Sequence, residues 1–234
     1  EDIYTTAGLP STYGDGTRES NLKCDFTKGI TIEFWLKSND LPEHRQDIFH
    51  LKNEAGGDAF TIFLDGGVGS GSPFKTSLSA SSSKIFEYEV LGNTPTKATI
   101  SDWNHYAISF KNGNSGTKTK FYVNGILDQE TELGSDTLAT LEQSGTLAFI
   151  ATGSDIQHFQ LAASMDEFRF WKVERTPQDI GRNWFGQIRG GTNTDINNTT
   201  LGVYYKFNEG ITGVSATDSI VLDYSGRVSN GTRP

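Results

Sequence analysis

Apolar and polar residues alternate along several segments of the chain, and this period of two is typical of β-strands. The alternation is cleanest in Ile30–Lys37 (ITIEFWLK), where Ile30, Ile32, Phe34 and Leu36 share one face and Thr31, Glu33, Trp35 and Lys37 share the other. Similar patterns predict strands at Ala59–Asp65, Lys84–Leu91, Trp103–Lys111, Thr119–Val123, Ile126–Gln129, Gly145–Thr152 and Gly202–Asn208. Loops rich in glycine and serine separate these segments, so the sequence predicts an all-β chain.

The segment Ser164–Gly181 (SMDEFRFWKVERTPQDIG) predicts one more strand followed by a short helix. Strict alternation places Met165, Glu167, Arg169 and Trp171 on one side of this strand and Asp166, Phe168 and Phe170 on the other. Thr176 supplies an N-cap hydroxyl, Pro177 fits the first helical position and Asp179 complements the positive end of the helix dipole. We expect helix at Pro177–Phe185 and strands or loops elsewhere.

Turn signals indicate how the strands are connected. Asn124-Gly125, between two strand segments, is typical of a two-residue type I′ hairpin. Many short strands with such turns and a single short helix predict a two-sheet antiparallel jelly-roll sandwich. No break in composition and no internal repeat divides residues 1–234, so we expect one domain, which we also expect to be a fragment of a longer polypeptide.

Composition narrows the classes of function. The formal net charge of −9 argues against a nucleic-acid groove, because phosphate binding requires clustered lysines and arginines. No apolar run is long enough to cross a bilayer, so membrane insertion is not expected. Cys24 is the single cysteine, which excludes an intrachain disulfide, and we expect its thiol to behave as a small buried apolar group.

An ordered set of motifs resembles the laminin-G-like branch of the concanavalin A-like lectin/glucanase superfamily. The motifs are FTKGITIEFWLK, WNHYAISF, KFYVNG, MDEFRFWKVERTPQDI, LGVYYKFNEG and LDYSG, and together they extend over nearly the whole chain. This resemblance implies a jelly roll of two curved antiparallel sheets, in agreement with the strand pattern.

The C-terminal block is similar to laminin-G-like domains in structural proteins of tailed phages, particularly marine T4-like ones. It reads GRNWFGQIRGGTNTDINNTTLGVYYKFNEGITG, followed by DSIVLDYSGRVSNG. The similarity implies a virion protein exposed on capsid or tail, with other virion subunits, further copies of itself or host-surface glycans as partners. The alternative is a carbohydrate-binding or adhesion domain of a secreted bacterial protein, located outside the cell or at its surface.

Catalytic patterns are missing from the sequence. Glucanases of the superfamily carry Glu-x-Asp-x-x-Glu on one strand, and glycoside hydrolysis needs two carboxyl groups across the scissile bond. The acidic cluster Asp128–Glu132 lacks this spacing, and Glu87 and Glu89 have no third partner. The four histidines are scattered, and no serine lies in a Gly-x-Ser-x-Gly turn. We therefore expect a protein without enzymatic activity.

Calcium is the cofactor that the resemblance suggests. Sandwich lectin domains often bind Ca²⁺ through a carboxylate near the start of a late strand and through backbone carbonyls, as suits a hard cation. Asp166 is the residue at the matching strand, and Asp15 in an early loop is the candidate partner. The alternative is that Asp166 orients its strand while Asp15 lies in a turn.

Glycan binding requires exposed aromatic rings that stack on sugars, together with polar groups for the hydroxyls. Trp35 lies opposite the apolar face of its strand, and Trp103 begins a strand. We therefore take Trp35 and Trp103 as glycan-binding candidates. Packing in the core or at a sheet edge is the alternative for both residues, as it is for Trp171 and Trp184.

Overall fold

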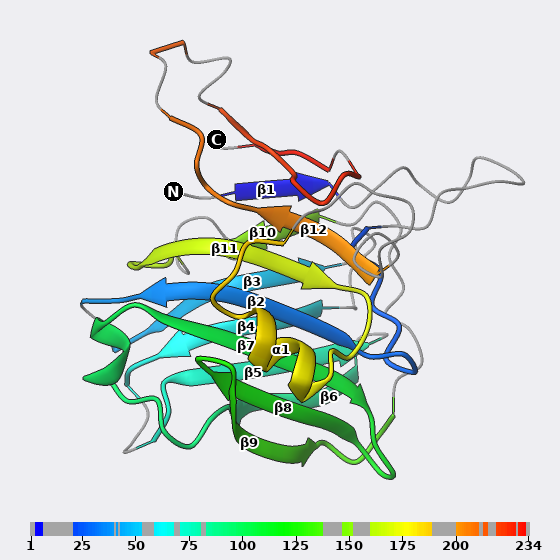
Figure 1. Ribbon diagram of the computed structural model, residues 1–234. Helices are drawn as coiled ribbons and strands as arrows, with labels where there is room; N and C mark the ends of the chain where they lie inside the picture. Colours follow the sequence, from blue (N-terminus) through cyan, green and yellow to red (C-terminus); the bar gives the residue numbers. More distant parts are fainter. Residues whose placement is uncertain are drawn as a thin grey trace, which may run out of the picture.

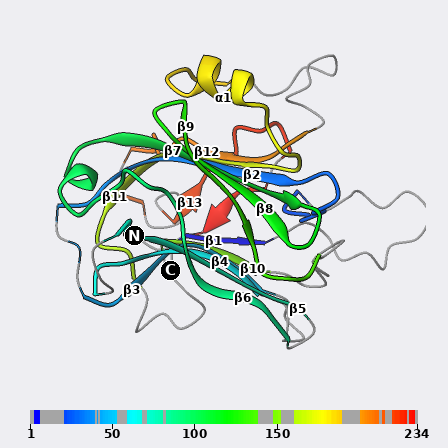
Figure 2. The same ribbon diagram turned by 90° about the horizontal axis from the view of Figure 1, so that it is seen from below.

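Two antiparallel sheets face each other across a hydrophobic core in the computed structural model of the protein (Figure 1, Figure 2). The structure describes residues 3–6, 21–39, 41, 43–52, 59–67, 71–80, 83–137, 147–151, 160–188, 200–210, 213–214, 219–227 and 229–232. The arrangement confirms the predicted all-β sandwich with one short α-helix. The described residues contain no helix of the length and apolar character that spanning a membrane requires.

One sheet has eight strands in the order β13-β14-β1-β10-β3-β4-β5-β6. The bounds are β1 Ile3–Thr6, β3 Arg45–Lys52, β4 Ala59–Asp65, β5 Phe74–Ala80, β6 Ser83–Val90, β10 Leu147–Ile150, β13 Ile220–Val221 and β14 Gly231–Thr232. Alternation alone did not predict β1, β3, β5, β13 or β14. The sheet brings the first and last described segments together, because β14 pairs with β1.

The other sheet has six strands in the order β12-β11-β2-β7-β8-β9. The bounds are β2 Ile30–Lys37, β7 Asn104–Asn112, β8 Thr117–Val123, β9 Ile126–Leu133, β11 Ser164–Trp171 and β12 Leu201–Tyr205, with a 3-10 turn η1 at Thr99–Ser101 before β7. Asn124 and Gly125 both have positive φ, 48° and 79°, as a type I′ turn requires. The predicted hairpin therefore joins β8 to β9.

The core lies between the inner faces of the two sheets and is rich in phenylalanine. The ring of Phe60 meets that of Phe110 at a centroid distance of 4.9 Å, and Phe49 meets Phe168 at 5.6 Å. Each such ring, fully withdrawn from water, contributes about 1.5–3 kcal/mol to folding. Cys24 is fully buried in the same core, as expected from the sequence.

The helix α1, Pro177–Asn183, lies on the outer face of the six-stranded sheet (Figure 2). The Thr176 hydroxyl accepts a hydrogen bond from the Asp179 backbone N–H at 3.1 Å, which confirms the predicted cap. Ile180 is buried against Ala107 and Tyr122. The helix ends at Asn183, two residues earlier than predicted, because the chain turns there and the Gly186 N–H donates to the Asn183 carbonyl.

Candidate functional site

A β-bulge in β11 determines which side chains reach the outer face of the six-stranded sheet. Asp166 pairs with Trp35 of β2, but the next pair along the strands is Arg169 with Glu33, so β11 holds one extra residue between the two pairs. Glu167 lies in this bulge with a φ of 53°, in the left-handed region. Bulges of this kind redirect side chains and are frequent beside functional sites.

The bulge overturns the predicted side-chain direction at the start of β11. Strict alternation placed Asp166 on the side of Phe168 and Phe170, and both phenylalanines are indeed in the core. Asp166 instead lines an outer cleft together with Glu167, because the extra residue reverses the alternation. Met165, predicted on the side opposite Phe168 and Phe170, packs against the core for the same reason.

This outer cleft, which we call the aromatic cleft, has a volume of about 400 Å³. It is lined by Trp35, Trp103, Asp166, Glu167, Arg169, Phe185, Gly186 and Gln187. The fold thus brings together three of the four residues that the sequence suggested as site residues. Asp15, the fourth, lies outside the described residues.

Two of the rings in the aromatic cleft are open to solvent. The Trp103 side chain is 45% exposed and Phe185 is 69% exposed. Trp35 is half-buried, with its ring 5.6 Å from that of Trp184 and 5.8 Å from that of His105. Trp35 therefore forms a fixed wall of the cleft, whereas Trp103 and Phe185 offer accessible apolar surface.

The two neighbouring carboxylates of the cleft have different environments. Asp166 Oδ1 accepts a hydrogen bond from the Glu167 N–H at 2.8 Å, and burial raises the pKa of Asp166, with the Glu167 charge adding to the effect. Glu167 Oε2 lies 2.8 Å from Nη2 of Arg169 and also accepts a hydrogen bond from the Tyr204 hydroxyl. Glu167 is thus held in place, and Asp166 is the carboxylate without an ion-pair partner among the described residues of the cleft.

Arg169 fixes the segment that carries Phe185 and Gln187. Its guanidinium is almost fully buried and donates to the Gly186 carbonyl at 2.6 Å and to the Asn183 carbonyl at 3.5 Å. Sequence reasoning did not identify Phe185, Gln187 or Glu167 as site residues. The aromatic pair Trp184-Phe185, directly after the capped helix, is the feature of the sequence that could have indicated this part of the cleft.

A buried charge cluster underlies the cleft and α1. Glu33 is fully buried, with Oε1 2.7 Å from Arg175 Nη1 and Oε2 3.5 Å from Arg169 Nη1 and 3.7 Å from His105 Nε2. Burial alone would raise the pKa of Glu33, but its hydrogen-bonding and charged neighbours His105, Arg175 and Arg169 outweigh burial and lower it to about 2. Glu33 therefore stays ionised and anchors the residues on both sides of α1.

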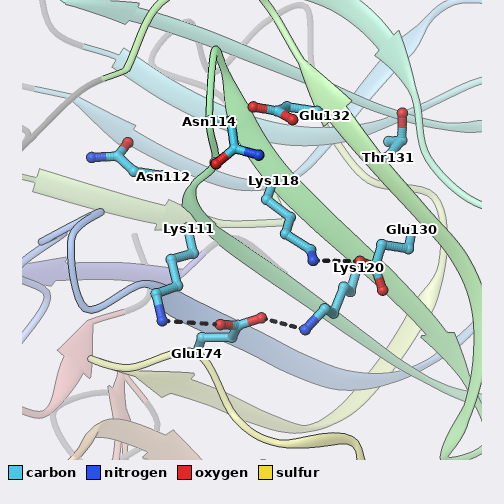
Figure 3. A pocket seen from close by; sticks show the side chains of 10 residues that line it. Lys111, Asn112, Asn114, Lys118, Lys120, Glu130, Thr131, Glu132 and Glu174 are labelled. Atoms are coloured by element: carbon cyan, nitrogen blue, oxygen red, sulfur yellow. Dashed lines mark hydrogen bonds and ion pairs between the residues drawn. The ribbon is translucent and has the colours of Figure 1, made fainter.

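A second hollow, of about 530 Å³, lies over β7, β8 and β9, and we call it the charged groove (Figure 3). It is lined by Lys111, Asn112, Gly113, Asn114, Lys118, Lys120, Glu130, Thr131, Glu132 and Glu174. Its lysines are paired: Lys118 with Glu130 at 2.5 Å, and Lys120 and Lys111 with Glu174 at 2.6 and 3.4 Å. The groove has no aromatic lining and its charges neutralise one another, so it is the weaker candidate for a binding site.

Metal ligands are sparse in the described part of the chain. No group of three or more histidine, cysteine, aspartate or glutamate side chains gathers there in a way that could hold a metal ion. Asp166 alone presents a carboxylate of the predicted pair to the cleft. Calcium therefore stays a prediction from the sequence, with Asp166 as its ligand.

The sequence was compared with protein families and with curated proteins. A family model for the concanavalin A-like lectin/glucanases superfamily, Laminin_G_3, matches residues 12–181, which is most of the chain. No curated protein matches the sequence.

Three solved structures are similar to this chain at low sequence identity. A Bacteroides ovatus protein proposed to bind carbohydrate is 16% identical, with a TM-score of 0.56; the match covers 99% of this chain and 57% of that one. A heptameric pentraxin from Limulus polyphemus is 12% identical, covering 77% of this chain and 80% of that one, at a TM-score of 0.44. Domains LG4-5 of the mouse laminin α1 chain are 11% identical, covering 72% and 39%, at a TM-score of 0.45.

Proposed function

Because the chain belongs to the concanavalin A-like lectin/glucanase superfamily, we propose that it is a non-enzymatic carbohydrate-binding domain whose binding site is the aromatic cleft. The observation that carries this proposal is the meeting of the exposed Trp103 ring and the Asp166 carboxylate in one cleft. Rings of this kind stack on the apolar faces of sugars, and carboxylates accept hydrogen bonds from sugar hydroxyls. The Bacteroides ovatus protein of the same fold, itself proposed to bind carbohydrate, agrees with this assignment.

The cleft is organised before any ligand arrives. Arg169 fixes the backbone at Gly186, and Trp35 packs against Trp184. A sugar that enters the cleft therefore has few protein groups to order, which reduces the entropic cost of binding. Asp166 and the Gln187 amide supply polar groups in the lining of the cleft.

The environment of Glu167 supports binding without catalysis. Hydrolysis of a glycosidic bond needs one carboxyl group as acid and a second as nucleophile or base. The Glu167 carboxylate is occupied by Arg169 and Tyr204, which leaves Asp166 as the single available carboxylate among the described residues that line the cleft. We expect no release of reducing sugar from β-glucans. Turnover that Glu87→Gln or Asp166→Asn abolishes would contradict this part of the proposal.

The setting that we propose is a tailed-phage virion, where the domain is exposed on capsid or tail and attaches to host-surface glycans or neighbouring subunits. The support is the similarity of the C-terminal block, from Gly181 to Gly231, to phage structural proteins. Mass spectrometry of virions purified from the source of the gene should detect peptides of this chain. Detection only in the secreted fraction of a bacterium would favour the alternative, an adhesion domain of a secreted protein.

A glycan array tests the binding function itself. The wild-type domain should bind a subset of immobilised glycans, and Trp103→Ala should lose that binding while Tyr88→Ala keeps it. Tyr88 is a matched control because it is 47% exposed but lies on β6 of the other sheet. Absence of binding by the wild type, or equal binding by both variants, would contradict the proposal.

A further inference from the structure

The aromatic cleft borders a second aromatic surface at the edge of the six-stranded sheet. Lys206 directly follows β12, and its Nζ lies 3.3 Å from Oε1 of Gln187, which lines the cleft. The same Nζ lies 4.7 Å from the ring centre of Tyr224 and 5.4 Å from that of Tyr204. Tyr224 is 36% exposed, so an accessible ring and an ammonium group continue the polar and aromatic lining of the cleft.

These groups lie along a row of neighbouring strands, since β2, β11 and β12 are adjacent in the sheet (Figure 1). Trp35 of β2 pairs with Asp166 of β11, and Phe168 of β11 pairs with Tyr205 of β12. Beyond β12 the Tyr224 N–H donates to the Tyr204 carbonyl at 2.8 Å, which adds a further extended segment. Three strand spacings, or about 14 Å measured across the sheet, therefore separate the strand of Trp35 from the segment of Tyr224, and the two residues are also offset along the strands because Tyr204 pairs with Arg169 and not with Asp166. One pyranose ring, similar in size to an aromatic side chain, does not bridge that span.

Two charged groups lie at the far end of this row: Lys206, and Glu209, whose carboxylate interacts with the Tyr224 hydroxyl and accepts a hydrogen bond from the Leu222 N–H at 3.1 Å. Nζ of Lys206 makes one hydrogen bond, to the Gln187 amide oxygen, and faces two tyrosine rings. No carboxylate of the described residues lies within ion-pair distance of it, whereas Arg169 and the three lysines of the charged groove are all paired. An ammonium group with spare donors next to an exposed ring matches a sugar that carries a negative charge.

We propose that the row from Trp103 to Tyr224 is one extended site for an oligosaccharide, and that the sugar unit at Lys206 carries a carboxylate or a sulfate. This inference rests on the proposed carbohydrate-binding function and specifies its ligand class. One sugar stacks in the aromatic cleft and gives hydroxyls to Asp166. A later unit covers Tyr224 and places its anionic group on Lys206. Both Lys206 and Tyr224 lie outside the residues matched by the family model.

Matched pairs of charged and neutral oligosaccharides test the proposal. Suitable probes are galacturonic acid monomers, dimers and trimers with their methyl esters, and sulfated galactan trimers with desulfated counterparts. Titration calorimetry on the whole chain should show affinity that rises from monomer to trimer. At least one charged trimer should bind about tenfold more tightly than its neutral counterpart, as expected for one charge-assisted contact. A preference for galacturonic acid over its methyl ester identifies a carboxylate as the anionic group, and a preference for sulfated over desulfated galactan identifies a sulfate.

Variants of Lys206 separate this inference from the function on which it rests. Lys206→Met keeps the apolar stem and should remove the preference for charged trimers, whereas Lys206→Arg should retain it. Equal affinity of the wild type for charged and neutral trimers, or a preference that survives Lys206→Met, would overturn the extended anionic site. If the extended anionic site is overturned in this way but Trp103→Ala still abolishes binding, the proposal of carbohydrate binding in the aromatic cleft is retained. If no probe and no arrayed glycan binds, both proposals fail.

Discussion

Glu33 and Arg175 form a buried ion pair, with Oε1 of Glu33 2.7 Å from Nη1 of Arg175 and neither side chain more than 7% exposed. The pair joins the outer face of β2 to the residue before the N-cap of α1. The Arg175 guanidinium also lies 4.1 Å from the centre of the Trp171 ring. The Glu33 carboxylate thus holds α1 on the sheet through Arg175. Through Arg169, which donates to the Gly186 carbonyl, it also holds the segment of the aromatic cleft that carries Phe185.

Replacement of Glu33 should therefore cost far more stability than replacement of a surface carboxylate. Glu33→Gln leaves Arg175 and Arg169 buried without their counter-ion, and we expect the free energy of unfolding to fall by about 3–5 kcal/mol. Urea denaturation followed by tryptophan fluorescence measures this. Glu130→Gln, which breaks the exposed pair with Lys118, is the control and should leave the midpoint nearly unchanged. Equal losses in the two variants would contradict the assigned role of Glu33.

The same residue predicts the acid sensitivity of the fold. The pKa of Glu33 is lowered from 4.5 to about 2, so its ionised form is favoured in the folded state. Its contribution to stability is therefore complete above pH 4.5 and is lost as the pH falls from 4.5 towards 2. Denaturation midpoints measured across that interval should fall with pH in the wild type. The fall should be shallower in Glu33→Gln, and identical slopes would argue against an ionised Glu33.

Gly125 in the β8–β9 hairpin should tolerate no side chain. Its φ is 79°, and a Cβ atom there would lie 2.2 Å from Cδ1 of Trp184. Gly125→Ala should lower the free energy of unfolding by about 1–3 kcal/mol, because it combines left-handed backbone strain with overpacking. Gly210→Ala is the matched control, since a Cβ at that position meets nothing within 4 Å. Thermal unfolding measures the midpoints of the two variants. A midpoint of Gly125→Ala as high as that of Gly210→Ala would be inconsistent with the close packing of Gly125 against Trp184.

The fold class and several strands were predictable because they depend on local alternation and turn chemistry. The bounds of β2 and β4 match the prediction residue for residue, and the Thr176 cap and Asn124-Gly125 turn are local features. The strand β3 was missed because it buries Gln46 and Asp47, so its sequence lacks polar alternation. The segment is extended because it pairs with β4 on one side and β10 on the other, and β10 is distant in the sequence.

The site was only partly predictable, since distant contacts assemble it. The side on which Trp35 lies followed from alternation. The direction of Asp166 did not, because the bulge depends on how β11 aligns with β2, more than 100 residues earlier in the chain. Phe185 was missed for a similar reason: Arg169 places it through backbone carbonyls, which leave no pattern in the sequence.

The affinity of Trp103 variants for a glycan that the wild type binds on the array tests the central claim most directly. Trp103→Ala should weaken binding at least tenfold, since stacking on an aromatic ring contributes on the order of 1–3 kcal/mol. Trp103→Phe should retain part of the affinity, and both variants should keep the wild-type circular dichroism spectrum, because Trp103 is 45% exposed and lies outside the buried core. An unchanged dissociation constant in Trp103→Ala, with the fold intact, would contradict the aromatic cleft as the binding site.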